Sequence, residues 1–334
     1  MTSAAVEQDN LFIPLIDFAP FRGGSAADKK AVANDIVNGF RNAGFIYLKN
    51  HGISPAAVAS VFGQSAKFFQ LPQDQKDKLA WYSAEANRGY TAHGREKVSM
   101  ADVEDVDALR ESNPDLKESL EIGRDDEPQF PNMWPPQEGE SQWPTEFRKE
   151  TMGFFEQCKE MHRLVMSSIA VGLGIGETWF DGFTSDGDNT LRLLHYPAVS
   201  REVFEKNVGQ VRAGEHTDYG SMTLLFQDAR GGLQVESPNG NFVDATPIPD
   251  TIVVNAGDLM ARWSNDYIKS TKHRVVEPPN KTSEYPARYS IAYFCNPNFT
   301  SKIEAIPGTV AEGVQKYEPI ISGEYLVQRL TATY

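Results

Sequence analysis

Cysteine is nearly absent from this chain of 334 residues: Cys158 and Cys295 stand far apart and form no CxxC pair. The sequence therefore has neither a disulfide framework nor a cysteine-rich zinc motif, as expected for a cytoplasmic protein in a reducing compartment. Long hydrophobic runs are also missing, since the longest span only about five to eight residues and a membrane helix needs roughly 18–20. Residues 1–10 lack the basic and apolar regions of a signal peptide.

Positive charge is scarce as well. The chain has 32 Lys and Arg against 46 Asp and Glu, which gives a formal net charge of −14. Such a surface repels phosphate backbones and anionic lipids, and the scattered cations form no basic cluster, so we expect neither nucleic-acid nor membrane binding. An apolar fraction of 40% with 11% aromatic residues suffices for a sizeable core. We expect a globular monomer.

Helical signals gather in the first half of the chain. Ser25 followed by Asp28 is a variant of the capping box, and apolar residues every four positions then continue a helix that Gly44 ends. Further elements expected there are strands over Leu11–Asp17 and Phe45–Lys49, a helix beginning at Ser54-Pro55, and a long core helix over Glu146–Gly172.

Short apolar runs separated by Gly, Pro, Asn and Asp follow after about residue 189, which favours an antiparallel sandwich or barrel. The expected strands are Leu191–His195, Met222–Phe226, Leu233–Val235, Thr251–Val254 and Tyr289–Tyr293. We therefore predict one α+β structural domain with a mainly β core. Its parts are an N-terminal region (1–100), a charged, Pro-rich excursion (101–145), the long helix with its connection (146–188) and the strand-rich core (189–334).

Metal-binding chemistry is indicated by His216 and Asp218. Residues two apart on a strand point to the same face, so an imidazole and a carboxylate can converge on one ion. His273, directly after a predicted turn, is the candidate third ligand. Two histidines and one carboxylate leave open coordination positions that suit Fe(II), a bidentate co-substrate and O₂, although a hydrolytic zinc site would use the same ligands.

Arg288 and Ser290, two residues apart on a predicted strand, favour the iron alternative. A guanidinium binds a carboxylate through two hydrogen bonds, and a hydroxyl on the same face adds a third donor. This pair is suited to the distal carboxylate of a dicarboxylic keto acid that chelates the metal at its other end.

The spacing of His216-Thr217-Asp218, His273 and Arg288-Tyr289-Ser290 resembles that of the Fe(II)/2-oxoglutarate dioxygenases related to isopenicillin N synthase. The resemblance covers nearly the whole chain and implies a double-stranded β-helix (jelly roll) with N-terminal helices packed outside. It also implies that His216, Asp218 and His273 bind iron, that Arg288, Ser290 and Tyr196 bind 2-oxoglutarate, and that O₂ is consumed, with ascorbate as an activator to test. One departure is Leu194-His195-Tyr196-Pro197, where plant relatives usually carry Asn-Tyr-Tyr-Pro.

Further stretches, such as Arg212–Gly220 and Phe294–Asn298, are similar to a fungal branch of this family that hydroxylates the methyl group of thymine. The resemblance implies that Asn189, Tyr219 and Phe294 contact a small planar heteroaromatic substrate, and that oxidation can continue to the aldehyde and acid. Stacking aromatics and one amide suit a pyrimidine. The alternatives left open are a natural-product dioxygenase that oxidises a ring methyl, a metal-dependent hydrolase, and a ligand-binding jelly roll without catalysis.

The other histidines that we considered have structural interpretations. We expect His195 to be a hydrogen-bonded strand residue and His162 to be packed in the core of the long helix. His51 lies in a turn signal and is expected to bond the local backbone.

Overall fold

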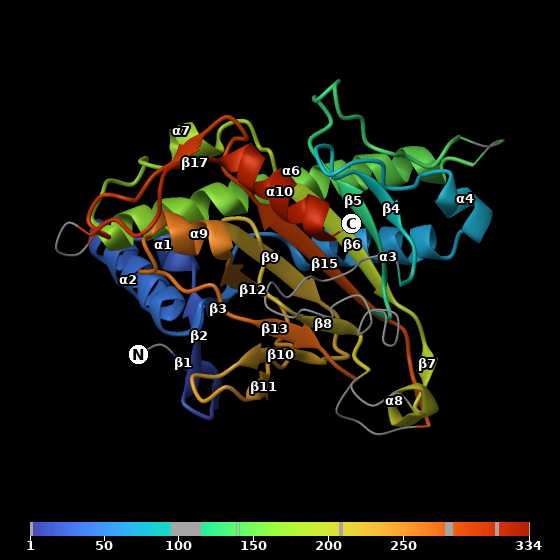
Figure 1. Cartoon of the computed structure of the whole chain (residues 1–334), viewed down its shortest axis with the longest axis horizontal. Coiled ribbons are helices and arrows are strands. Elements are labelled where there is room, and N and C mark those ends of the chain that lie inside the picture. Colours follow the sequence, from blue (N-terminus) through green and yellow to red (C-terminus); the bar gives the residue numbers. More distant parts are fainter. Residues whose placement is uncertain are drawn as a thin grey trace.

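The protein is described by a computed structural model that covers residues 3–94, 115–137, 139, 141–206, 210–277, 283–310 and 314–333. A large sheet and a small sheet form its centre, and helices cover the outer face of the large sheet (Figure 1). This arrangement confirms the prediction of a mainly β core with helices packed outside.

The large sheet has nine strands and contains the N-terminal elements as well as the C-terminal core. In spatial order they are β1 (Ser3–Gln8), β2 (Leu11–Asp17), β3 (Phe45–Lys49), β12 (Thr251–Ala256), β9 (Met222–Gln227), β15 (Arg288–Cys295), β6 (Thr190–Tyr196), β5 (Glu118–Ile122) and β4 (Gly89–Thr91). Every neighbouring pair is antiparallel except β2 and β3, which run parallel. The strands expected from the sequence are all present, and most of them extend one to three residues beyond the expected bounds.

The small sheet has four strands: β11 (Phe242–Asp244), β10 (Leu233–Glu236), β13 (His273–Val275) and β8 (Ala213–His216). Two minor pairs, β7 (Val199–Ser200) with β14 (Glu284–Tyr285) and β16 (Lys302–Ile303) with β17 (Ile320–Ile321), complete the strands of the described residues. A cluster of buried apolar side chains from both sheets, including Leu194, Val235 and Ala292, fills the space between them. Alternate residues of the large sheet thus face the small sheet, as a two-sheet core requires.

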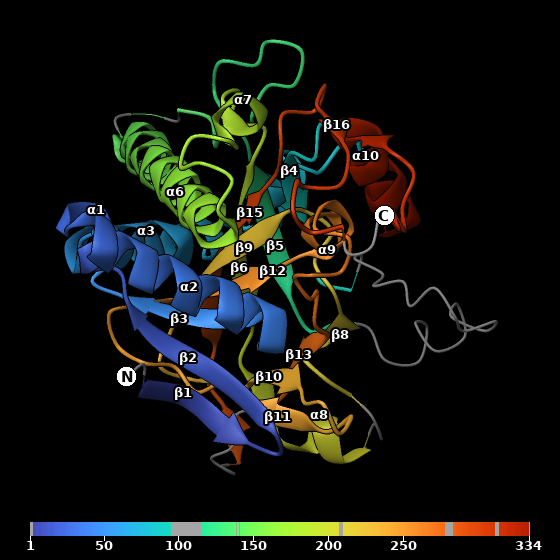
Figure 2. The same ribbon diagram turned by 90° about the vertical axis from the view of Figure 1, so that its left-hand side faces the viewer.

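Capping residues fix the long helices. Ser25 and Asp28 form the predicted capping box at the start of α2 (Ala26–Ala43), and Gly44 ends it with a left-handed φ of 70°. Ser54 accepts a hydrogen bond from the Ala57 amide and begins α3 (Pro55–Phe69). Together with α6 (Trp143–Leu173), these helices pack on the face of the large sheet that lies away from the small sheet (Figure 2).

The remaining helices are short or peripheral. They are α1 (Ala19–Gly23), α4 (Gln73–Asp77), α7 (Asp181–Thr184), α8 (Glu202–Lys206), α9 (Asp258–Trp263) and α10 (Ser322–Thr333). No helix among the described residues is long and apolar enough to cross a membrane.

The structure differs from the sequence-based expectation in the start of the long helix and in the nature of the segment before it. The long helix begins at Trp143, not Glu146, because Pro144 occupies its first turn, where a missing N–H costs nothing. The segment 101–145 is not simply an excursion, since β5 lies within it and all five of its residues are buried in the large sheet. Residues 101–114, 138 and 140 of that segment lie outside the described part of the chain. The strand β1 was not predicted from the sequence.

Candidate metal and substrate site

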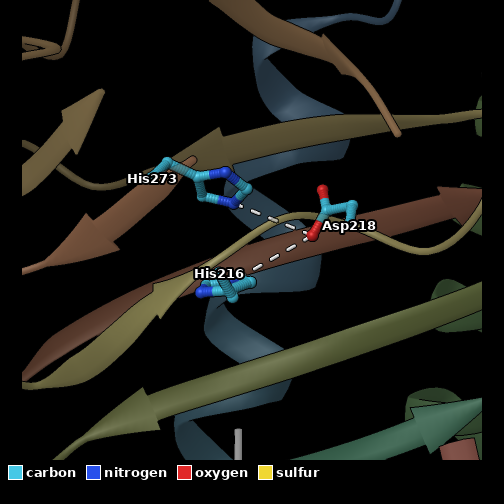
Figure 3. A group of neighbouring side chains, drawn as sticks. All are labelled: His216, Asp218 and His273. Atoms are coloured by element: carbon cyan, nitrogen blue, oxygen red, sulfur yellow. Dashed lines mark ion pairs between the residues drawn. The ribbon is translucent and has the colours of Figure 1, made fainter. Parts of the chain in front are cut away.

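Two neighbouring strands and one turn bring the three predicted metal ligands together. His216 ends β8 and lies directly opposite His273, the first residue of β13. Asp218 lies in the turn after β8, so it approaches the histidines from a loop and not from the strand face that its spacing suggested. The three ligand atoms lie within 4.8 Å of one another, and the Asp218 Oδ1 is 3.9 Å from His216 Nε2 and 3.7 Å from His273 Nε2 (Figure 3).

Backbone carbonyls orient both imidazoles. His216 Nδ1 lies 2.7 Å from the Gly214 carbonyl, and His273 Nδ1 lies 3.2 Å from the Thr271 carbonyl. A carbonyl oxygen can only accept, so each Nδ1 carries the proton and each Nε2 presents its lone pair toward Asp218. The two rings are therefore preset to bind a metal ion between them.

The protonation states of the ligands also suit a metal. Burial and the neighbouring His273 lower the pKa of His216 to about 4. Burial by itself would raise the pKa of Asp218, but the two imidazoles and the hydrogen bonds from Thr223 and Asn255 lower it overall. At neutral pH the site thus offers the neutral His216 imidazole and the Asp218 carboxylate, the forms in which these groups bind a cation.

The turn that carries Asp218 is pressed against the start of α9. The Asp258 amide donates to the Asp218 carbonyl at 2.7 Å. Gly257 makes this approach possible, because a Cβ there would lie 2.4 Å from the Gly220 carbonyl oxygen. Asp258 then accepts from Thr217 Oγ1 at 3.0 Å and from Ser270 Oγ at 2.7 Å, so that one carboxylate holds the turns leading to two metal ligands.

The predicted co-substrate residues lie side by side on the large sheet. Arg288 on β15 pairs directly with Tyr196 on β6, and its guanidinium carbon lies 4.8 Å from the centre of the Tyr196 ring. Arg288 is 1% exposed, donates through Nε to the Gly231 carbonyl at 2.9 Å, and contacts Ser290 Oγ through Nη1 at 3.3 Å. The residues thus form a buried, positively charged cradle.

A second buried guanidinium increases the positive charge at this end. Arg212 is fully buried and donates through Nη2 to the Pro286 carbonyl at 3.1 Å, while its Nε and Nη1 have no hydrogen-bond partner among the described residues. Burial, together with repulsion from Arg288, lowers the pKa of Arg212 to about 10. Two buried cations favour an anionic ligand, and this agrees with the doubly charged 2-oxoglutarate.

A cavity of about 90 Å³ opens beside the metal ligands. His216 and Asp218 contribute to its wall, together with the predicted substrate residues Tyr219 and Phe294. Its remaining lining comes from polar residues of the large sheet, from neighbouring loops and from the C-terminal helix: Asn87, Lys117, Thr190, Arg192, Thr217, Gly220, Asn296, Phe299, Leu326, Leu330 and Thr333. Flat aromatic surfaces and hydrogen-bonding groups therefore share one small chamber next to the metal site.

Asn189 is held inside the protein and is not among the described lining residues of this chamber, so its contact with the substrate stays a prediction. The residue is 1% exposed. Its amide donates to the Tyr293 hydroxyl at 3.0 Å and accepts from the Asn296 amide nitrogen at 2.9 Å. These bonds inside the protein use the amide to fix the end of β15.

Arg192, unlike Asn189, is among the described lining residues of the chamber. It lies on β6 with its guanidinium carbon 5.1 Å from the Phe294 ring centre, and its Nε forms a 2.7 Å ion pair with Glu121 of β5. The sequence could have indicated that Arg192 faces the site. It is an even number of positions from the predicted co-substrate residue Tyr196, so the two side chains share one face of β6.

The three remaining histidines that we considered behave as expected. His195 contacts Glu118 at 2.7 Å and stacks on Tyr289, which makes it a hydrogen-bonded strand residue. His162 is buried in α6, and this burial lowers its pKa to about 3. His51 accepts a hydrogen bond from the Ile53 amide at 3.3 Å.

Comparison with known proteins agrees with this geometry. Residues 13–146 match the family model for the non-haem dioxygenase in morphine synthesis N-terminal region, and residues 187–297 match the 2OG-Fe(II) oxygenase superfamily. The 2-oxoglutarate-Fe(II) type oxidoreductase ppzD of Metarhizium rileyi is 36% identical over 328 residues, which cover 96% of this chain and 90% of ppzD.

Solved structures extend the comparison. The full-length thymine 7-hydroxylase of Neurospora crassa in complex with alpha-KG and thymine is 60% identical, with a TM-score of 0.93, and the match covers 99% of this chain and all of that one. The same protein with alpha-KG and 5-formyluracil is 58% identical, with a TM-score of 0.91 and full coverage of both chains. The chain therefore belongs to the 2OG-Fe(II) oxygenase superfamily, and it is a jelly-roll dioxygenase that uses Fe(II), 2-oxoglutarate and O₂.

Proposed function

We propose that this enzyme hydroxylates the methyl group of thymine, with His216, Asp218 and His273 as the iron ligands. The observation that carries the proposal is the chamber beside these ligands, where aromatic and cationic side chains converge on a space for one small ring. The similarity over the full chain to the thymine-bound Neurospora crassa enzyme supports the same substrate.

In this proposal, Arg288, Ser290 and Tyr196 hold 2-oxoglutarate. The guanidinium and the hydroxyl donate to the distal carboxylate, while the Tyr196 ring packs against the guanidinium and holds it in place. Bound in this way, iron and the keto acid supply the oxidising power: thymine, 2-oxoglutarate and O₂ become 5-hydroxymethyluracil, succinate and CO₂.

The protein's own contribution is to orient the ring. Phe294 and Tyr219 offer aromatic faces on which a pyrimidine stacks, and Arg192 donates hydrogen bonds to a carbonyl oxygen of the ring. Glu121 keeps the Arg192 side chain fixed at the cavity wall. With its ring held in this manner, the substrate presents its methyl group toward the metal ligands, and repeated binding of each product allows oxidation to the aldehyde and acid.

The direct test is to incubate the iron-loaded protein with thymine, 2-oxoglutarate and O₂ and to measure succinate together with 5-hydroxymethyluracil by mass spectrometry. We expect both products in equal amounts early in the reaction, before 5-hydroxymethyluracil is oxidised further. If no pyrimidine raises the rate of succinate formation above the rate measured without substrate, thymine is not the substrate.

Oxidation of a ring methyl in a natural product is the second candidate function. Fungal relatives such as ppzD, the proline hydroxylase buaE and the dioxygenase htyE are 32–36% identical to this chain and carry various names. Arg192 separates the two candidates. Its replacement by Met should lower kcat/KM for a pyrimidine, whose carbonyl oxygen needs a donor, by about 10- to 150-fold, but spare activity on an arene that only stacks. The hydrolase alternative is set aside, because the chain belongs to an oxygenase family.

A further inference from the structure

The C-terminal helix α10 forms one wall of the substrate chamber. Leu326, Leu330 and Thr333 reach the cavity from its inner face. The helix follows β17 at the far end of the chain (Figure 1), yet these three residues line the cavity beside the metal ligands. Its position therefore contributes to the shape of the chamber.

Arg329, on the same helix, contacts two parts of the site at once. Its guanidinium carbon lies 4.5 Å from the centre of the Tyr219 ring, and its Nη2 forms a 3.0 Å ion pair with Asp258 Oδ2. That same carboxylate oxygen accepts from Thr217, the residue between two of the metal ligands. One side chain thus joins α10 to the turn that bears Asp218 and Tyr219.

The Tyr219 hydroxyl is also attached to α10. It lies 2.6 Å from Thr333 Oγ1, and the Thr333 hydroxyl lies 3.1 Å from the Arg329 carbonyl, to which it donates. Because that bond uses the single Thr333 proton, Tyr219 is the donor in the first bond. The ring is consequently fixed at its tip by Thr333 and on its face by the Arg329 guanidinium.

We propose that Arg329 is a positioning residue for substrate recognition: by holding the Tyr219 ring against α10, it sets the aromatic wall on which the planar substrate stacks. The inference rests on the proposed function, since it takes Tyr219 as a substrate contact. Arg329 is not a lining residue of the cavity, so its effect must pass through Tyr219 and Asp258.

The test compares Arg329→Met and Arg329→Lys with wild-type full-length enzyme. A guanidinium on an aromatic face and a half-exposed ion pair together account for about a five- to tenfold change in binding. We therefore expect KM for thymine to rise by about five- to tenfold in Arg329→Met, while KM for 2-oxoglutarate stays unchanged. The fraction of succinate formed without 5-hydroxymethyluracil should increase. Arg329→Lys, which keeps the ion pair, should recover part of the loss.

A spectroscopic measurement checks the same point without turnover. In anaerobic Fe(II)/2-oxoglutarate enzyme, uracil, which lacks the reactive methyl, should perturb the charge-transfer band at higher concentration in Arg329→Met than in wild type, whereas the band itself should be unchanged. Thr333→Val removes the hydrogen bonds of the Thr333 hydroxyl to Tyr219 and to the Arg329 carbonyl but keeps the ion pair of Arg329, and it provides a milder variant if Arg329→Met does not fold.

Arg163→Met is the matched control, because Arg163 forms a 2.7 Å ion pair with Glu160 on α6 and is not a cavity residue. It should behave like wild type. An unchanged KM for thymine in both Arg329→Met and Thr333→Val, or an equal rise in both KM values, overturns the inference. Failure of the wild-type enzyme to hydroxylate thymine would instead overturn the proposed function.

Discussion

Replacing Arg192 by Met tests how the chamber recognises its substrate. The guanidinium lies over Phe294 and is held by Glu121, so it faces the cavity as an ordered cation. A hydrogen bond from a charged group contributes about 1.5–3 kcal/mol. Loss of one such bond to a pyrimidine carbonyl should reduce kcat/KM for thymine by about 10- to 150-fold. KM for 2-oxoglutarate should not change.

The same replacement has a second effect that must be separated from recognition. Glu121 is fully buried, and removal of Arg192 breaks its buried ion pair, which costs about 3–5 kcal/mol of folding stability. The double variant Glu121→Gln/Arg192→Met removes the carboxylate charge, while Ser119 and Thr91 can still hydrogen-bond the amide.

The assay therefore measures both melting temperature and kcat/KM for wild type, Arg192→Met and the double variant. We expect the double variant to recover most of the melting temperature but none of the activity. Recovery of activity together with stability would show that Arg192 acts only through folding, and it would refute the assignment of Arg192 to the substrate.

Three further outcomes are expected. Asp218→Asn should retain no iron after dialysis and show no charge-transfer band with 2-oxoglutarate, as measured by metal analysis and absorbance, because the site loses its carboxylate; iron at wild-type occupancy would contradict the ligand set. Gly257→Ala should destabilise the fold by about 1–3 kcal/mol, since its Cβ meets the Gly220 carbonyl, whereas Gly63→Ala in α3, where nothing lies within 4 Å, should stabilise by about 0.5–1 kcal/mol in denaturant titrations. His162 has a folded pKa of about 3, below its ordinary 6.5, so the folded state binds fewer protons than the unfolded state between these values and stability falls as pH falls. Between pH 7.5 and 5.5 this costs about 1.4 kcal/mol, a loss that should be absent in His162→Leu.

Signals that act within a few residues of the chain were predictable. Helix ends depend on hydrogen bonds between residues close together in the chain, so residue types alone indicate them. Examples are the capping pair Ser25 and Asp28, the helix end at Gly44 and the helix start at Ser54. The three residues predicted as metal ligands from their types and spacing do lie together, although Asp218 reaches the cluster from a turn.

Features that depend on a distant partner were not predictable from pattern alone. Asn189 precedes its strand, so strand alternation could not tell which way its amide points, and its partners Tyr293 and Asn296 lie more than 100 positions away. The ion pair with Glu121 fixes the Arg192 side chain at the cavity wall. Glu121 belongs to β5, a buried strand inside a segment whose charge and proline content suggested a surface loop.

The division of ligands between the two sheets has one more consequence. His216 and His273 belong to the small sheet, whereas Arg288, Ser290 and Tyr196 belong to the large one. A keto acid that chelates the metal and reaches Arg288 spans the gap and ties the two halves of the sandwich together. Iron and 2-oxoglutarate should then raise the melting temperature more in combination than the sum of their separate effects. Together they would act as a removable cross-link between the two sheets.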